Sequence, residues 1–159
     1  MNSLVINLLG EYDCKLDAKG RLMLPVGLKK QLAEVMSKGF VINRNLHQHC
    51  LVLYPHEEWQ RLSGKLNRLN RLIKKNDVIV RKVMGGATPV EPDNTGRLLI
   101  PKSLVEHAKL ETELKVVGSN STVEIWSKSE YESFMNDDNV DMEALAEDVF
   151  GSMNDPDHE

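Results

Sequence analysis

The sequence predicts an α+β fold built from two tandem β-rich modules with short flanking helices. Three observations carry this prediction: an internal repeat, alternation of apolar and polar residues beside each copy, and helical spacing between them. The chain has 159 residues, of which 41% are hydrophobic and 28% charged. This size and composition fit a globular protein with one ordinary domain or two small ones built alike.

A nine-residue motif occurs twice in the chain. Residues 17–25 read DAKGRLMLP and residues 93–101 read DNTGRLLIP, so the Asp, Gly, Arg and Pro positions are identical at an offset of 76. A second block repeats in the same order: LVLY at 51–54 precedes Glu-Trp, and VEIW at 123–126 precedes Glu-Tyr. Two ordered blocks predict a duplicated module of about 50–70 residues.

In the first module, alternation predicts a strand at 12–16 and a second short strand at 21–24, joined by a hairpin turn. Asp17 opens the turn because its carboxylate can accept bonds from backbone N–H groups two or three residues on. Gly20 tolerates the positive φ that such a turn needs, and Pro25 ends the strand. A helix is predicted at 27–36, ended by Gly39. A strand pair follows at 40–42 and 50–54, and a further helix begins at residue 56.

The second module is predicted to follow the same order. We expect a strand at 97–100 and a helix from 101. A strand pair at 114–117 and 123–126 and a helix at 129–134 should follow. The domain limits that follow are 5–62 for module one, 63–86 for linking helices, 87–135 for module two and 136–159 for an acidic tail.

An amphipathic helix is predicted between the modules, followed by a short helical stretch at 77–84. Its apolar stripe consists of Trp59, Leu62, Leu66, Leu69 and Ile73. The opposite, basic face consists of Arg61, Lys65, Arg68, Arg71, Lys74 and Lys75. Such a face is most often solvated or paired with a neighbouring subunit, and it can also meet nucleic acid.

Charge is distributed unevenly along the chain. The net charge is −4, yet residues 136–159 contain nine acidic side chains and no Lys or Arg, which leaves +5 on the rest. An acidic end on a basic body is typical of a nucleic-acid binder with a screening tail, and equally of a tail that only improves solubility. We expect one amphipathic segment at 140–150 and a partly disordered polar end.

Several function classes lack a sequence signature. There is no P-loop, no GxGxxG after a strand, no GxSxG and no HExxH, so we expect no enzyme, no cofactor and no small-molecule substrate. His47, His49 and Cys50 are zinc-binding residue types, but their spacing fits a polar hairpin loop better than a metal site. With Cys14 as the other cysteine there is no disulfide framework, which predicts a cytosolic setting. The apolar runs are too short for a membrane span, and the first residues lack the basic segment of a secretory signal.

The arginine beside each turn is the strongest functional signal. The planar guanidinium of Arg21 or Arg97 can make two parallel hydrogen bonds to guanine O6 and N7. A two-stranded ribbon is narrow enough to enter the major groove of DNA. Lys15 and Lys19 lie on the same predicted hairpin and suit phosphate contacts. These residues predict a double-stranded DNA-binding hairpin in each module.

The aspartate of each motif leaves two interpretations open. Asp17 and Asp93 can cap their turns and hold the neighbouring arginine by a charge-assisted bond. The same pair also fits a purely structural role, in which it only fixes a repeated turn. In that second interpretation the chain is an oligomeric assembly module that does not bind DNA.

The two hairpins resemble the Asp-x-x-x-Arg motifs of the MraZ family. The opening LGEY at 9–12 and the segment 51–59 resemble that family too, and the resemblance covers about residues 5–135 but not the acidic tail. It implies two AbrB-like modules, duplicated swapped-hairpin-type β-barrel halves, in a bacterial transcriptional repressor. It further implies ring-like homo-oligomers, nucleoid association, and G-rich direct repeats upstream of the chain's own gene in the division and cell-wall gene cluster.

Residue roles follow from this resemblance position by position. The DNA-facing arginines and their motif partners are Arg21, Arg97, Asp17, Asp93, Gly20 and Gly96. The phosphate-contacting role of Lys15 and Lys19 rests on charge and position instead. The second turn, with Asn94-Thr95, has no counterpart to Lys19, so we expect the second module to be less basic.

Overall fold

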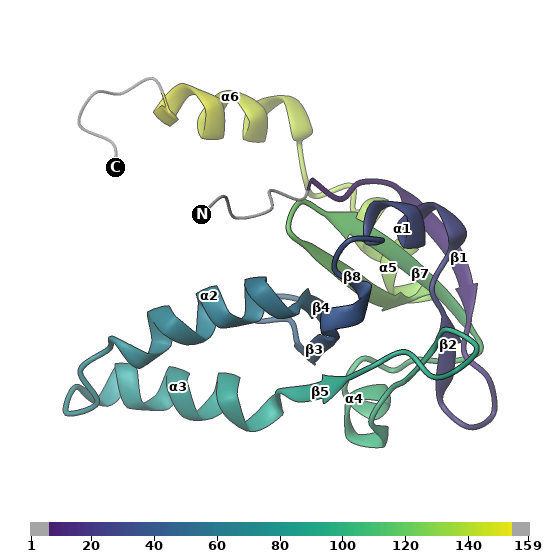
Figure 1. Cartoon of the computed structure of the whole chain (residues 1–159). Helices are drawn as coiled ribbons and strands as arrows, with labels where there is room; N and C mark the ends of the chain where they lie inside the picture. The colour runs from purple at the N-terminus through teal and green to yellow at the C-terminus, as the bar shows by residue number, and fades with distance from the viewer. Residues whose placement is uncertain (1–6, 154–159) are drawn as a thin grey trace.

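The two halves of the chain contain the same succession of elements, as the computed structural model of residues 7–153 shows (Figure 1). The α+β class is confirmed. The strands are β1 (Glu11–Lys15), β2 (Arg21–Met23), β3 (Phe40–Arg44), β4 (Leu51–Pro55), β5 (Thr88–Val90), β6 (Arg97–Leu99), β7 (Glu113–Ser119) and β8 (Thr122–Ser127). The helices are α1 (Val26–Gln31), α2 (His56–Asn67), α3 (Lys74–Gly86), α4 (Lys102–His107), α5 (Lys128–Met135) and α6 (Met142–Met153).

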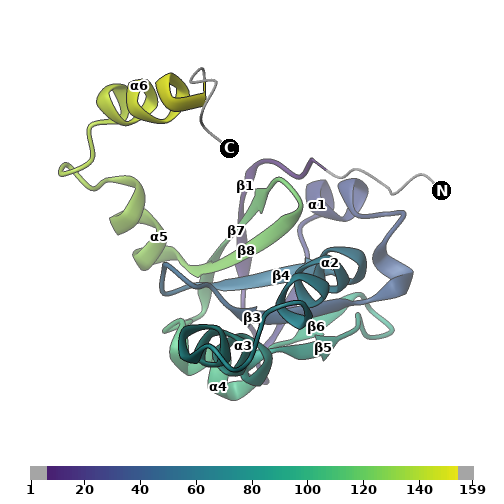
Figure 2. The same cartoon turned by 90° about the vertical axis from the view of Figure 1, so that its left-hand side faces the viewer.

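The strands form one six-stranded and one two-stranded antiparallel sheet. The large sheet has the order β1-β7-β8-β4-β3-β5, and the small sheet pairs β2 with β6. When each strand is replaced by its counterpart in the other half, the order of the large sheet becomes the same order read from the opposite edge. The two halves are therefore related by an approximate two-fold axis. The first strand of each half pairs with the other half, and the modules are therefore intertwined (Figures 1 and 2).

Strand β5 is absent from the sequence prediction. Residues 88–90 lie 76 positions after 12–14, so β5 is the counterpart of β1. Pro89 hides the strand, because proline lacks the N–H that a central strand needs. The position tolerates it because β5 lies at the sheet edge, where Pro89 faces Val41 of β3.

The core lies between the sheets and the two short helices α1 and α4. Leu22 and Leu98 face each other on the inner side of the small sheet and are almost fully buried. Leu28 of α1 and Leu104 of α4 are buried in the same cluster. Helix α1 is shorter than the predicted 27–36: it ends at Gln31, and turns lead to a 3-10 segment (Met36–Lys38) before Gly39 at φ 77°.

Helices α2 and α3 form an antiparallel pair that projects from the sheet (Figure 1). Leu66, Val80 and Val83 are buried between them. The predicted stripe from Trp59 to Ile73 on one helix is wrong at its end, because α2 stops at Asn67 and Ile73 precedes α3 with 46% exposure. The buried Asn43 amide donates to the Val83 carbonyl oxygen at 2.8 Å and ties α3 to β3.

The C-terminal segment holds two helices of different character. Helix α5 begins at a Ser127 cap, whose hydroxyl accepts from the Glu130 N–H, and buries Tyr131. Helix α6 begins two residues later than the amphipathic segment predicted at 140–150, extends to Met153 and buries none of its residues. The polar end at 154–159, predicted to be disordered, lies outside the described residues. Within residues 7–153, no helix has the length and apolar character that crossing a bilayer requires.

Candidate nucleic-acid interface

The first repeated turn is closed by the Asp17 carboxylate. Its Oδ1 accepts the backbone N–H groups of Lys19 and Arg21, each at 2.9 Å, and its Oδ2 accepts Nε of Arg21 at 2.9 Å. Gly20 sits at φ 81°, in the left-handed region that glycine adopts without strain. The predicted roles of the aspartate, capping the turn and holding the arginine, thus coexist in one carboxylate.

The second turn repeats this arrangement with one change. Oδ1 of Asp93 accepts the backbone N–H groups of Thr95 and Arg97, each at 2.9 Å, and the Thr95 hydroxyl at 2.8 Å. Nε of Arg97 donates to Thr95 Oγ1 at 2.8 Å and lies 3.3 Å from Asp93 Oδ2. In the second turn the Thr95 hydroxyl therefore accepts the arginine Nε–H bond that the aspartate carboxylate accepts in the first turn.

Pairing of β2 with β6 brings the two turns into one site. Arg21 lies opposite Leu99, and Met23 lies opposite Arg97, so these four residues share the outer face of the small sheet. Nη1 of Arg97 is 3.9 Å from Oδ2 of Asp17, across the boundary between the two modules. The two arginines thus belong to one composite surface rather than to two separate hairpins.

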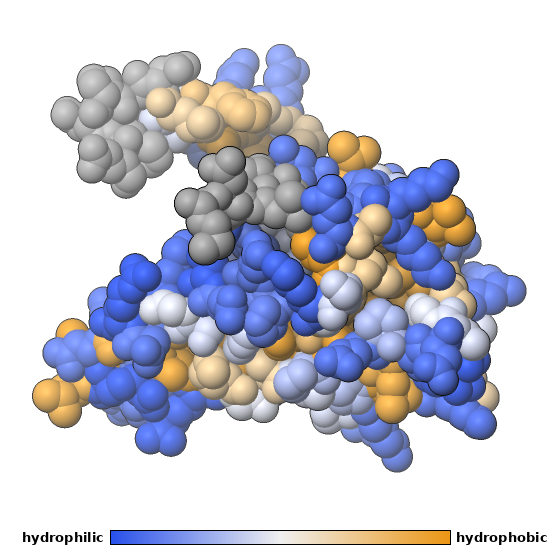
Figure 3. Space-filling model, in the orientation of Figure 1, coloured by the Kyte–Doolittle hydropathy of each residue, from blue (hydrophilic) through white to orange (hydrophobic). Residues whose placement is uncertain are grey.

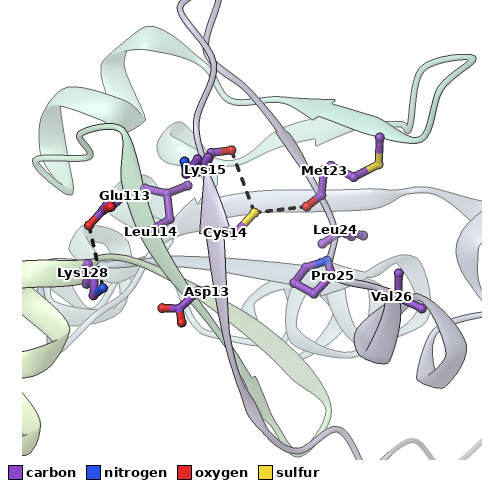
Figure 4. Close-up of a pocket in the computed structure, with 10 residues that line it drawn as sticks. All are labelled: Asp13, Cys14, Lys15, Met23, Leu24, Pro25, Val26, Glu113, Leu114 and Lys128. Atoms are coloured by element: carbon purple, nitrogen blue, oxygen red, sulfur yellow. Dashed lines mark hydrogen bonds and ion pairs between the residues drawn. The ribbon is translucent and has the colours of Figure 1, made fainter.

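The prediction that each ribbon is a hairpin formed within one module is therefore wrong. Strand β1 leaves the turn to pair with β7, and its backbone pairing with the β2 side is reduced to the turn and the Leu16–Leu22 bridge. Figure 4 shows the pocket that opens where β1 and residues 23–26 separate. Cys14 spans this gap, since its thiol donates to the Met23 carbonyl oxygen at 3.1 Å. Partial burial raises the pKa of that thiol.

The lysines are distributed differently from the prediction. Lys19 is exposed on the first turn, whereas Lys15 is exposed on β1, opposite Glu113 of β7. A third lysine near the turns, Lys29, was not predicted. Its Nζ donates to Met23 Sδ at 3.0 Å, and it would lie 3.3 Å from a Cβ placed on Gly96. The second turn, expected to be less basic, therefore has a cation supplied by the first module.

The geometry leaves donor groups free on both arginines. The Arg21 and Arg97 side chains are 27% and 33% exposed, and their Nε atoms are the ones engaged by Asp17 and Thr95. No hydrogen bond within residues 7–153 uses the terminal guanidinium nitrogens of either residue. Held at Nε, each guanidinium has a fixed plane and can offer a fork of donors to a base edge or a phosphate.

Asp93 is expected to titrate far below an ordinary aspartate. The backbone N–H of Arg97, followed by the Thr95 hydroxyl, stabilises the carboxylate and lowers its pKa to about 2. A lowered pKa in the folded state stabilises the turn above about pH 3.8, and this contribution disappears as the pH falls towards 2. Carboxyl ¹³C NMR titration checks this, and Thr95→Val should move the midpoint upwards. An Asp93 midpoint near 3.8 in the unsubstituted protein contradicts the described bonding.

The other candidate residues are not assembled into a site. No group of three His, Cys, Asp or Glu side chains in the described part of the chain could hold a metal ion. His47 and His49 are exposed on the β3–β4 loop, and burial raises the pKa of the Cys50 thiol well above its usual range. On the predicted basic helix face, Arg61 pairs with Glu58, and Arg71 pairs with Asp77 at 2.8 Å.

Comparisons with known proteins point to one family. Residues 8–82 and 83–152 each match the family model described as MraZ protein. The chain is 51% identical over 148 residues to the transcriptional regulator MraZ of Christiangramia forsetii, covering 93% of this chain and 96% of that protein. Proteins of the same name from Flavobacterium psychrophilum and Cytophaga hutchinsonii are 43% and 41% identical. These matches cover 99% and 87% of this chain and 98% and 91% of the two proteins.

Proposed function

The chain belongs to the MraZ family of transcriptional regulators, and we propose that it binds G-rich direct repeats upstream of its own gene and represses the division and cell-wall gene cluster. The family is one of regulators rather than enzymes. Double-stranded DNA is the proposed partner, and the proposed active form is a ring-like homo-oligomer. The proposed location is the cytoplasm, in association with the nucleoid.

One observation carries the proposal: the β2–β6 pair presents Arg21 and Arg97 on a single outer face. Arginine paired bidentately with guanine O6 and N7 is the commonest specific contact in the major groove, which admits a two-stranded ribbon. In this chain the ribbon is formed by β2 and β6 instead of by β1 and β2. Asp17 and Asp93 fix the turns that precede β2 and β6, while Lys19 and Lys29 supply positive charge nearby.

Footprinting on the DNA upstream of the chain's own gene tests this function. We expect protection of a tract that contains closely spaced G-rich repeats, at protein concentrations where an unrelated fragment of equal length stays unprotected. Protection of both fragments at the same concentrations would contradict sequence-specific binding. If neither fragment is protected at low salt at any protein concentration, DNA binding is contradicted altogether, since electrostatic attraction alone supports non-specific binding there.

The lysines are expected to contribute affinity without selectivity. Lys19→Ala and Lys15→Ala should each weaken binding to the repeats and to random DNA by the same factor. If the lysine neutralises one phosphate, the slope of log affinity against log salt should fall by about 1. Fluorescence anisotropy at four salt concentrations measures this slope. An unchanged slope for Lys15→Ala, with a reduced slope for Lys19→Ala, would confine the DNA to the turn and away from β1.

A further inference from the structure

Helix α6 carries an apolar stripe with nothing packed against it. None of its residues is buried, and the hydrophobic clusters found within residues 7–153 include none of them. The stripe recurs at helical spacing and consists of Met142, Leu145, Val149 and Met153. At 3.6 residues per turn, the carboxylates of Glu143 and Asp148 flank this stripe on its two sides, Glu147 lies nearly opposite it, and the exposed Phe150 adds apolar surface beside it. Figure 2 shows α6 apart from the sheets, and Figure 3 shows apolar surface along it.

A second unpartnered apolar surface lies on α3. Val80 and Val83 face α2 and are buried, whereas Val78 and Ile79 are exposed on a different side of the helix. Together with Leu46 from the β3–β4 loop, Val78 and Ile79 form the floor of a shallow depression, which we call the α3 groove. Its rim consists of Lys74, Lys75 and Lys82. Within residues 7–153 none of these lysines belongs to an ion pair.

We propose that α6 of one copy of this chain docks in the α3 groove of a second copy. The apolar stripe of α6 matches the apolar floor, and the two carboxylates that flank the stripe, Glu143 and Asp148, match the lysines of the rim. The helices have 12 and 13 residues, hence similar lengths of about 18–20 Å at 1.5 Å per residue. Neither surface is covered within one chain, where α6 stands away from α3 (Figure 2).

The occupant is a second copy rather than an unrelated protein because both complementary surfaces are present in this sequence. Contacts of this kind are heterologous, since the donor surface differs from the acceptor surface. Repetition of a heterologous contact generates a closed ring when the rotation between neighbours closes. The inference thus rests on the homo-oligomer proposed above and names its contact, but it does not require DNA binding.

Charge reversal tests the contact in the full chain. Glu143→Lys with Asp148→Lys should raise the concentration of half-association about tenfold, as should Lys75→Glu with Lys82→Glu. All four substitutions together should restore association. Sedimentation velocity over a concentration series measures this, and Lys30→Glu, at an exposed lysine of α1, is the control that should change nothing. If the quadruple variant associates no better than either pair, the charges do not face each other.

Cysteine cross-linking identifies which chain supplies each surface. Val149→Cys and Ile79→Cys in one chain should give a ladder of covalent multimers on a non-reducing gel after mild oxidation. A fast-migrating monomer would mean that α6 folds onto its own groove, and absence of both products would mean that the groove is not its site. Val26→Cys with Ile79→Cys is the matched control, because Val26 is an exposed apolar residue of α1.

The oligomer and the docking contact can fail separately in these experiments. A wild-type chain that sediments as a monomer at every concentration overturns both the ring and the contact. A wild-type oligomer whose mass is unaffected by reversal of either charged set overturns the contact and leaves the ring standing. Operator binding is scored independently by footprinting.

Discussion

Replacement of Arg21 by alanine is expected to lower affinity for the G-rich repeats by about 1–3 kcal/mol, which is roughly 5- to 150-fold. The loss arises because the lost donor fork would leave guanine O6 and N7 without their partner. Arg97→Ala should behave in the same way, since both side chains lie on the outer face of the β2–β6 pair. Affinity for random DNA should fall much less, so the ratio of specific to non-specific binding is the quantity to measure.

Two control variants separate base reading from loss of charge. Arg81→Ala removes the same charge from an exposed position on α3 and should leave the specificity ratio unchanged. Arg21→Lys keeps the charge but loses the planar fork, so it should retain non-specific affinity while losing discrimination. An Arg21→Ala variant that loses no more specificity than Arg81→Ala would exclude the composite surface as the reader. The competing structural role of Asp17 and Arg21 would then be favoured.

Leu98→Ala is expected to cost about 2–5 kcal/mol of unfolding free energy. Its side chain is 0% exposed and faces Leu22 across the β2–β6 pair, so the substitution leaves a cavity where the two modules meet. Leu99→Ala is the matched control one residue away, because that side chain is 58% exposed on the outer face. It should change stability by no more than about 0.5 kcal/mol.

Urea denaturation followed by circular dichroism measures both stability variants. The series is repeated at several protein concentrations, because association shifts apparent stability by mass action. Equal losses for Leu98→Ala and Leu99→Ala would contradict the described alternation of the small sheet. A change in the slope against urea, without a change in midpoint, would instead point to a less compact native state or a more expanded denatured one.

The turns were predictable from sequence because their bonds are local. Asp17 bonds to groups two and four residues ahead, so the spacing alone encodes the contact. The same holds for Asp93, and for the helix that follows each Pro. The helix pair was only partly predictable: the apolar stripe continues past Asn67 to Ile73, although the chain reverses direction between them.

Strand pairing was not predictable, because it depends on partners far apart in the chain. Nothing near Arg21 in the sequence shows that its strand pairs with Arg97 and its neighbours instead of with residues 12–16. The proximity of Lys29 to Gly96 was not predictable for the same reason, since 67 positions separate the two residues in the sequence. Strand β5 could have been predicted only from the repeat offset of 76, which aligns β1 with the segment around Pro89. The proline itself argues against a strand there.

The exchange of first strands between the halves has a consequence for how such a chain can evolve. Two identical half-length polypeptides could build the same core as a symmetric pair, without the α2 and α3 helices that connect the two halves in this chain. Fusion into one gene removes the requirement that both copies stay alike. Thr95 could then replace a lysine in one turn while Lys29, from the other half, keeps a cation beside it. Divergence of the halves is thereby compatible with a shared surface that contains both Arg21 and Arg97.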